Sequence, residues 1–203
     1  MRCLFIDTSS FFINVAIIEN NSILFNYNEK IQKDMSSKIM PIIKKGFDSV
    51  SFEISDIDKI FVVNGPGSFT GLRVGVTVAK TIAWSLKIDL IPLSSLEVIA
   101  SILSDKKYRV GIIDARRGNV FAGIYDDNLN VIKNDQFIPY EKLKEELDEQ
   151  YDIVGIEDTK VKPNLIKIIQ KHINDKSINP HTLKPNYLKL TEAEEKLNDK
   201  RNN

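Results

Sequence analysis

Residues 60–86 read IFVVNGPGSFTGLRVGVTVAKTIAWSL, and this stretch decides the fold. Residues 60–63 are apolar, β-branched and aromatic, which predicts a short buried strand that Asn64-Gly65 ends with a turn. Glycine at 65, 67 and 71 allows unusual backbone angles and close approach by other groups. An amphipathic helix follows from about Gly71, and Ser68 and Thr70 are candidate N-terminal caps. The stretch therefore predicts a strand, a glycine loop and a helix.

A strand that leads through a glycine loop into a helix N-terminus has two interpretations. It can present bare N–H groups to an anion, or it can let a helix pack closely on its neighbours. The phosphate-loop pattern fails because Leu72-Arg73 follows Gly71 where Lys-Ser or Lys-Thr is required, and the dinucleotide-binding spacing fails by one residue. Gly71 and Gly75 lie on one helix face. We favour close packing over phosphate binding.

The composition indicates a soluble globular protein. The chain has 203 residues, of which 42% are hydrophobic, and its 28 basic and 28 acidic residues cancel. Without excess positive charge, the chain is not expected to hold a nucleic acid unaided. The single cysteine, Cys3, cannot form an intramolecular disulfide. With no long apolar run and no signal peptide at the N-terminus, we expect a cytoplasmic protein with no membrane contact.

An internal repeat suggests two related lobes. A shift of 107 positions places Phe5-Ile6-Asp7 on Ile112-Ile113-Asp114, and it places residues 16–21 on residues 123–128. Each copy reads as a strand ending in Asp, a short turn and a returning strand. Helical and strand patterns alternate in the rest of the chain, which predicts a mixed α/β fold. We expect an N-terminal lobe over residues 1–104 and a smaller C-terminal lobe over 105–203 with a frayed tail.

Few residues are candidates for chemistry. The only histidines, His172 and His181, lie far in sequence from Ser68, and no spacing typical of zinc or iron ligands occurs. Asp7 and Asp114 each end a buried strand, where a carboxylate could meet magnesium or cap a local turn; we favour the cap. Arg116-Arg117 could hold a phosphate, but two solvated arginines in a hairpin turn are the preferred interpretation.

Four motifs in the same order resemble the bacterial TsaB (YeaZ) family. They are Asp7-Thr8-Ser9, the block from Gly65 through Gly75, Ile113-Asp114-Ala115-Arg116-Arg117-Gly118, and Pro185-x-Tyr187-Leu188 before Ala193-Glu194. The resemblance spans nearly the whole chain. It implies a two-lobed actin/Hsp70/sugar-kinase-like (ASKHA) fold with duplicated RNase H-like lobes.

The resemblance also implies a function. Members of the family act in forming N6-threonylcarbamoyladenosine next to the anticodon of tRNA, as non-catalytic paralogues of the transferase TsaD. The implied partners are a TsaD-like subunit and a TsaE-like ATPase, with a homodimer when the chain is alone and tRNA reached only through the complex. The metal-binding histidines of TsaD-like proteins have no counterpart in residues 34–50, and no cofactor or metal is implied. An ATP- and magnesium-dependent kinase or ATPase of the same fold is the alternative, and a peptidase ranks below it.

Two sets of residues follow as site predictions. The first is a partner interface on the two first-lobe helices, which we expect to pack against the equivalent helices of a paralogue; it comprises Met35, Ile39, Ile42, Ile43, Gly71, Leu72, Gly75, Val76 and Ala79. The second is a vestigial nucleotide or anion site, which comprises Asp7, Thr8, Ser9, Gly65, Gly67, Ser68, Thr70, Asp114 and Arg116.

Overall fold

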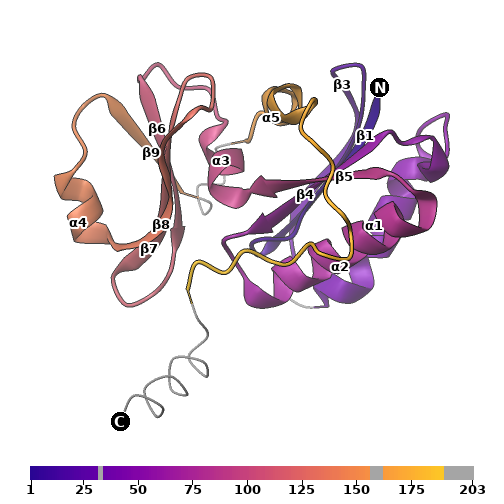
Figure 1. Ribbon diagram of the computed structural model, residues 1–203, viewed down its shortest axis with the longest axis horizontal. Helices are drawn as coiled ribbons and strands as arrows, with labels where there is room; N and C mark the ends of the chain where they lie inside the picture. The colour runs from indigo at the N-terminus through magenta and orange to yellow at the C-terminus, as the bar shows by residue number, and fades with distance from the viewer. Residues whose placement is uncertain (32–33, 156–161, 190–203) are drawn as a thin grey trace, which may run out of the picture.

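The computed structural model describes residues 1–31, 34–155 and 162–189, which form two β-sheets with helices around them (Figure 1). The first sheet has the strand order β3-β2-β1-β4-β5. Its antiparallel meander is β1 (Arg2–Asp7), β2 (Phe12–Glu19) and β3 (Ser22–Lys30), and the parallel strands β4 (Lys59–Gly65) and β5 (Asp89–Ser94) extend it beside β1.

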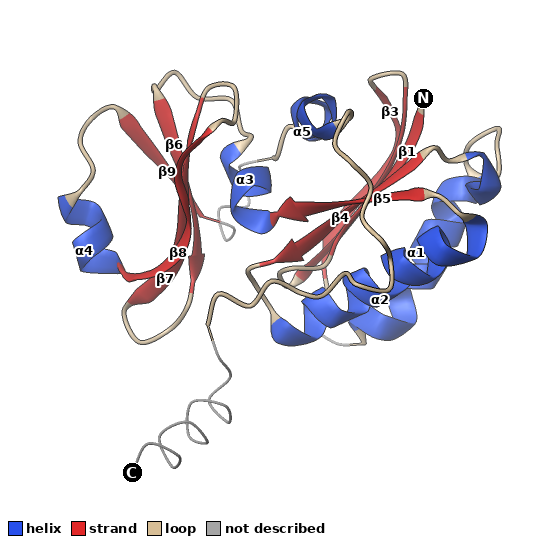
Figure 2. Cartoon of the chain, viewed as in Figure 1, coloured by secondary structure: helices blue, strands red, loops and turns tan. Residues whose placement is uncertain are grey.

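Helices cover both faces of the first sheet. α1 (Met35–Asp48) and α2 (Phe69–Leu86) lie side by side on one face, and α5 (Leu165–His172) lies on the other (Figure 2). A short 3-10 turn, Ile54–Asp56, precedes β4. The α1 and α2 face encloses Leu4, Ile6 and Ile60, all fully buried. Because side chains alternate along a strand, Phe5 and Phe61 form a second core cluster on the α5 side.

The second sheet repeats the pattern with the order β8-β7-β6-β9. It consists of β6 (Tyr108–Asp114), β7 (Asn119–Asp126), β8 (Val131–Pro139) and β9 (Tyr151–Gly155), with β9 parallel to β6 and the other pairs antiparallel. The short helix α4 (Tyr140–Glu145) lies on one side of it. Helix α3 (Ser95–Ala100) lies between the two sheets (Figure 1).

The α/β fold with two related lobes is confirmed, and the strand and helix predicted within residues 60–86 are found as β4 and α2. Ser68 caps α2, with its Oγ 3.2 Å from the Gly71 N–H it accepts. Ser94 caps α3 by accepting from the N–H groups of Leu96 and Glu97. The predicted Ser68 cap holds because a cap depends on neighbours only a few residues apart.

The predicted division at residue 104 needs correction for the last part of the chain. Helix α5 packs on the first sheet, where Ile168 is fully buried beside Phe5 and Phe61. The segment after it also belongs to the first lobe: the Ile178 N–H donates to Leu90 O, and Leu183 is buried in the core under α1 and α2. The order of strands and helices along the sequence does not show that the chain packs again on the first lobe after β9. The predicted frayed tail lies outside the described residues.

The internal repeat is real in topology, but its residue alignment needs a correction of one position in the first strand. Leu4 pairs with Ile17 in the first lobe, and both face the α1 and α2 core. The corresponding pair under α4 is Val110 and Ile124, shifted by 106 and 107 positions respectively. Asp7 and Asp114 are therefore not equivalent, because a shift of one residue moves a side chain to the opposite face.

Candidate functional site

The glycine loop packs directly on the β1–β2 turn. The Ser68 N–H donates to Ser9 O over 2.7 Å, and Thr8 Oγ1 donates to Gly71 O over 2.7 Å. A Cβ on Gly71 would lie 2.0 Å from Thr8 O, and one on Gly67 would lie 2.2 Å from Ser9 O. Such distances are far inside van der Waals contact. The packing interpretation of these glycines therefore describes the observed geometry.

Three N–H groups of the glycine loop and the start of α2 already donate within the chain. The Gly71 N–H donates to Ser68 Oγ, the Leu72 N–H to Ser68 O, and the Ser68 N–H to Ser9 O. Thr70 is exposed, and Gly65 is covered by Asn186, whose carbonyl would lie 2.4 Å from a Cβ at that position. The loop is thus filled by the chain itself.

Asp7 and Asp114 both cap local turns. Asp7 Oδ1 accepts from the Ser9 N–H at 2.8 Å, and Asp114 Oδ1 accepts from the Arg116 N–H at the same distance. Burial raises the pKa of Asp7, although hydrogen bonding to Ser9 opposes the shift. Asp114 and Arg116 are exposed at the tip of the β6–β7 hairpin, where Arg116 O accepts from the Asn119 N–H. The capping interpretation therefore fits both carboxylates.

The residues predicted as a partner interface lie in the core of the first lobe and not on its surface. All but Met35 are buried, and Met35 is half-buried against the same core. Leu72 and Ala79 are fully buried, and a Cβ on Gly75 would lie 2.3 Å from Thr8 Oγ1. The apolar stripes of α1 and α2 are satisfied by the protein's own sheet, so they cannot also form a surface. The buried members of the predicted set are Ile39, Ile42, Ile43, Gly71, Leu72, Gly75, Val76 and Ala79.

The opposite face of α2 carries an exposed tryptophan that the sequence analysis did not single out. Trp84 is 61% exposed, and its ring meets His181 edge to face with centroids 5.6 Å apart. Together with Lys80, Thr81 and Pro180 these side chains line a shallow hollow. Met40 on α1 is also exposed, at 48%. Exposed large apolar side chains of this kind are frequent at sites of protein association.

The C-terminal segment 178–189 runs along α2 and forms one wall of this hollow (Figure 1). Lys80 Nζ donates to Leu183 O at 2.9 Å, and the Asn186 N–H donates to Asn64 O at 2.6 Å. Tyr187 stacks on Phe69 with ring centroids 4.3 Å apart. The Pro185-x-Tyr187 motif thus fixes the segment to the start of α2, while Ala193-Glu194 lies outside the described residues.

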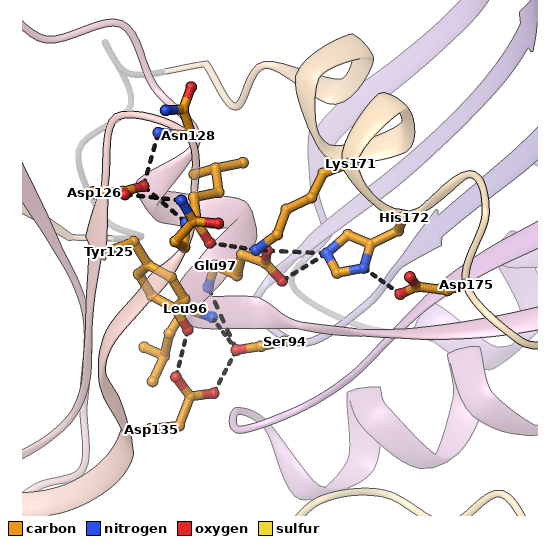
Figure 3. A network of polar contacts seen from close by, with 12 residues as sticks. Ser94, Leu96, Glu97, Tyr125, Asp126, Asn128, Asp135, Lys171, His172 and Asp175 are labelled. Atoms are coloured by element: carbon orange, nitrogen blue, oxygen red, sulfur yellow. Dashed lines mark hydrogen bonds and ion pairs between the residues drawn. The ribbon is translucent and has the colours of Figure 1, made fainter.

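A polar network joins the two lobes (Figure 3). One carboxylate, that of Asp135 on β8, accepts hydrogen bonds from the Ser94 hydroxyl at the end of β5 and from the Tyr125 hydroxyl on β7. Burial raises the pKa of Asp135, and the two hydrogen bonds oppose the increase. Since Ser94 belongs to the first sheet and Asp135 to the second, this carboxylate fixes one sheet against the other.

A second part of the network holds α5 on α3. His172 Nε2 lies 2.9 Å from Glu97 Oε1, and His172 Nδ1 lies 2.6 Å from Asp175 Oδ2. Lys171 Nζ donates to Glu97 over 2.6 Å and also to Leu129 O. Both ring nitrogens of His172 face carboxylates, so the doubly protonated ring suits this site. No sequence motif links Glu97 to Lys171, His172 or Asp175.

This network makes stability depend on pH. Burial lowers the pKa of His172, but its hydrogen bonds to Glu97 and Asp175 outweigh burial and raise the pKa. Burial raises the pKa of Glu97, but the bonds from His172 and Lys171 outweigh it and lower the pKa. The His172 contribution is therefore complete below its unfolded pKa of about 6.5 and is lost as the pH rises through its folded value. The Glu97 contribution is present above about pH 4.3 and is lost on acidification.

We expect His172→Gln to lower the free energy of unfolding by about 2 kcal/mol at pH 6, since charged hydrogen bonds are lost. The loss should be smaller at pH 8, where the wild-type ring is less protonated. Urea unfolding of both proteins at the two pH values measures this difference. The exposed His181 provides the control: its ring packs on Trp84, and His181→Gln should cost less than His172→Gln at pH 6. An equal cost of His172→Gln at both pH values would contradict a charged ring.

Within residues 1–31, 34–155 and 162–189, no three His, Cys, Asp or Glu side chains are grouped so that they could hold a metal ion. None of the helices in these ranges combines the length and apolar character needed to cross a membrane.

Comparison with protein families gives one match over most of the chain. Residues 27–166 match the family model TsaD, described as tRNA N6-adenosine threonylcarbamoyltransferase. This range includes the glycine loop, α2, the β6–β7 hairpin and the beginning of α5.

Two curated relatives are named "tRNA threonylcarbamoyladenosine biosynthesis protein TsaB". The one from Bacillus subtilis (strain 168) is 38% identical over 129 residues, which are 62% of this chain and 55% of that protein. The match thus spans about half the length of that relative. The one from Buchnera aphidicola subsp. Schizaphis graminum is 29% identical over 196 residues, 89% of this chain and 92% of that protein.

Among solved structures, the fold is similar to a Pseudomonas aeruginosa protein described as uncharacterized with similarity to peptidase YEAZ. The TM-score is 0.79 at 20% identity, and the alignment covers 93% of this chain and 99% of that one. The two-lobed fold expected from the motifs is therefore confirmed.

Proposed function

The chain belongs to the TsaD family, within which it falls with the TsaB (YeaZ) proteins, and from this premise we propose that it helps to form N6-threonylcarbamoyladenosine next to the anticodon of tRNA. The observation that carries the proposal is the family match over residues 27–166, with two relatives named for biosynthesis of this nucleoside. In this proposal the chain is an accessory subunit that supports a TsaD-like transferase.

A non-catalytic role is supported by what the candidate chemical groups do in the fold. Asp7 and Asp114 cap turns, and His172 lies between two carboxylates in the network that holds α5. His181 packs on Trp84. The N–H groups of Ser68, Gly71 and Leu72 are bonded within the chain, which disfavours a kinase or ATPase of the same fold. Each of these groups makes a hydrogen bond or a packing contact within the chain.

The docking surface is proposed on the outer face of α1 and α2, in place of the buried stripes. This face displays Met40 and Trp84, with Thr77 and Thr81 exposed between turns of α2. The hollow beside Trp84 can receive an apolar side chain of a partner. Two exposed helices side by side suit packing against two helices of a paralogue, as in a four-helix contact.

The partners in this proposal are a TsaD-like transferase and a TsaE-like ATPase, in the cytoplasm. A homodimer through the same helices would form when the chain is alone, because one surface can pair with its own copy. With 28 basic and 28 acidic residues, the chain has no excess charge for tRNA, so tRNA would be reached through the complex.

Depletion of the protein tests the proposal. We expect threonylcarbamoyladenosine to fall in bulk tRNA, as measured by nucleoside analysis, and to return when the wild-type chain is supplied. An Asp7→Ala variant that folds should restore the nucleoside as well as the wild type if the chain is non-catalytic. Unchanged threonylcarbamoyladenosine after depletion would refute the assignment.

A further inference from the structure

The outer face of α1 and α2 is basic, although the whole chain has equal numbers of basic and acidic residues. On α1 the lysines Lys38, Lys44 and Lys45 are all exposed, and Asp48 is the helix's one acidic residue. Asp48 lies 2.8 Å from Lys44, four positions earlier on the helix. Lys38 and Lys45 therefore carry positive charge that no carboxylate of α1 balances.

The second helix adds to this charge. α2 contains Arg73 and Lys80 and has no acidic residue over its 18 positions. The Arg73 Nε donates to the Tyr187 hydroxyl at 3.0 Å, and Lys80 Nζ donates to Leu183 O at 2.9 Å. Both acceptors are uncharged, so these hydrogen bonds orient the two cations and do not neutralise them.

The segment that runs along α2 continues the pattern. Residues 178–189 contain Lys184 and Lys189 and no aspartate or glutamate. His181, in the same segment, lines the hollow beside Trp84 together with Lys80. The titratable side chains that line this hollow are thus a lysine and a histidine, and neither can become an anion.

Acidic residues that flank these helices in the sequence are mostly engaged elsewhere. After α1, Asp56 and Asp58 lie against Arg2, through its guanidinium at 3.9 Å and its backbone N–H at 2.7 Å respectively. After α2, Asp89 lies 3.6 Å from Lys59. The other flanking carboxylates are those of Asp34 and Glu53. These two do not balance the cations of α1, α2 and residues 178–189.

The basic side chains share the face with exposed apolar ones. Met40 on α1 is 48% exposed, and Trp84 and Leu86 on α2 are 61% and 40% exposed. A partner protein that is apolar in the centre of its contact and acidic around it would complement both kinds of side chain. An RNA backbone would pair with the cations, but it would set its phosphates against Met40 and Leu86. The composition of this face therefore favours a protein.

We propose that the outer face of α1 and α2 recognises an acidic, amphipathic helical surface of its partner protein. This inference rests on the docking surface of the proposed function and adds the charge that the partner must carry. Apolar side chains of the partner would cover Met40 and Trp84, and its carboxylates would meet Lys38, Lys45 and Arg73. Such pairs chiefly give specificity and faster association. A homodimer through the same helices would bring two basic faces together, so it should tighten as salt rises.

A helical peptide tests the charge preference with the full chain. The probe has about 18 residues, with leucine at i, i+3, i+4 and i+7 spacing, glutamate on both flanks of this stripe and alanine elsewhere; the reference peptide has lysine in place of glutamate. We expect the glutamate peptide to bind at least about tenfold more tightly than the lysine peptide, and more weakly as salt rises. Fluorescence anisotropy measures both affinities.

Charge-reversing variants locate the binding. The double variant Lys38→Glu and Lys45→Glu should weaken binding of the glutamate peptide by at least about tenfold. Both side chains are exposed, so the fold should be kept, which circular dichroism checks. The matched control is Lys142→Glu with Lys144→Glu, which makes the same charge change at exposed lysines of another helix, α4. We expect the control to change the affinity by no more than about twofold.

Four results would overturn the proposal. They are equal binding of the two peptides, no binding of either, equal effects of the α1 and α4 variants, or a homodimer through these helices that weakens as salt rises. If an unmodified tRNA transcript binds the chain, loses binding in the α1 variant, and the glutamate peptide does not bind, RNA is the occupant instead.

The purified TsaD-like subunit separates this inference from the proposed function. If Trp84→Ala weakens its binding while the α1 double variant does not, the docking surface stands and the acidic partner is refuted. If the glutamate peptide binds selectively but depletion of the chain leaves threonylcarbamoyladenosine unchanged, the proposed function is refuted and the charge preference of the surface stands.

Discussion

Gly71→Ala is expected to lower the free energy of unfolding by about 3 kcal/mol, at the upper end for overpacked sites. The added Cβ would lie 2.0 Å from Thr8 O, an atom of the backbone that no change of rotamer can move. The substitution would also displace the Thr8 hydroxyl from its hydrogen bond to Gly71 O. For a chain of this length the melting temperature should fall by about 10 °C.

Gly118→Ala is the matched control for Gly71→Ala. Gly118 has φ +74° in the β6–β7 hairpin, and no atom lies within 4 Å of a Cβ built there. Its substitution should cost only about 1 kcal/mol, the strain of a left-handed backbone. Thermal and urea unfolding of both variants measure the two costs. Should Gly71→Ala be no more destabilising than Gly118→Ala, the close contact between α2 and the β1–β2 turn is not the reason for glycine.

Trp84→Ala is expected to weaken association with the TsaD-like subunit by about thirtyfold or more, as loss of a central interface tryptophan usually does. Because the indole is 61% exposed, its removal should leave the fold intact, which circular dichroism and melting can confirm. Isothermal titration with the purified transferase measures the affinity. Thr81→Arg on the same face should act in the same direction by filling the hollow.

The control for Trp84→Ala is Phe11→Ala, because Phe11 is equally exposed at 63% and lies in the β1–β2 turn, away from α2's outer face. We expect it to bind like the wild type. If Trp84→Ala binds the TsaD-like subunit normally while Phe11→Ala does not, the docking surface lies near the β1–β2 turn instead. Val76→Asp is unsuitable as a test, since Val76 is 3% exposed and a buried charge would unfold the lobe.

The error over the partner interface shows a limit of periodicity. The apolar stripes on α1 and α2 were correctly recognised, and the glycines were correctly assigned to close packing. An apolar stripe indicates only that a helix buries one face. It does not identify the surface that covers that face. Here the sheet of the same lobe covers that face, so Ile39 and Leu72 are buried. The outward face, with Trp84, has no periodic signal because one exposed tryptophan among polar residues makes no pattern.

The polar network between the two lobes shows a second limit of sequence analysis. Ser94 caps α3 and lies three residues before Glu97, which is the spacing of a capping box. The Glu97 side chain instead bonds His172, which is 75 residues away. Ser94 also donates to Asp135, which is 41 residues away. Contacts over such separations depend on how the lobes pack, and no local spacing encodes them.

The sequence by itself determined the α/β class, the strand, glycine loop and helix of residues 60–86, the Ser68 cap, the duplicated meander and the family resemblance. These features follow from backbone preferences and burial periods acting within about one turn or one strand. Only the tertiary structure decided which helix faces meet solvent and that α5 and residues 173–189 return to the first lobe. Each of these depends on which surfaces remain exposed after distant segments have packed together. The local sequence around a residue does not encode that packing.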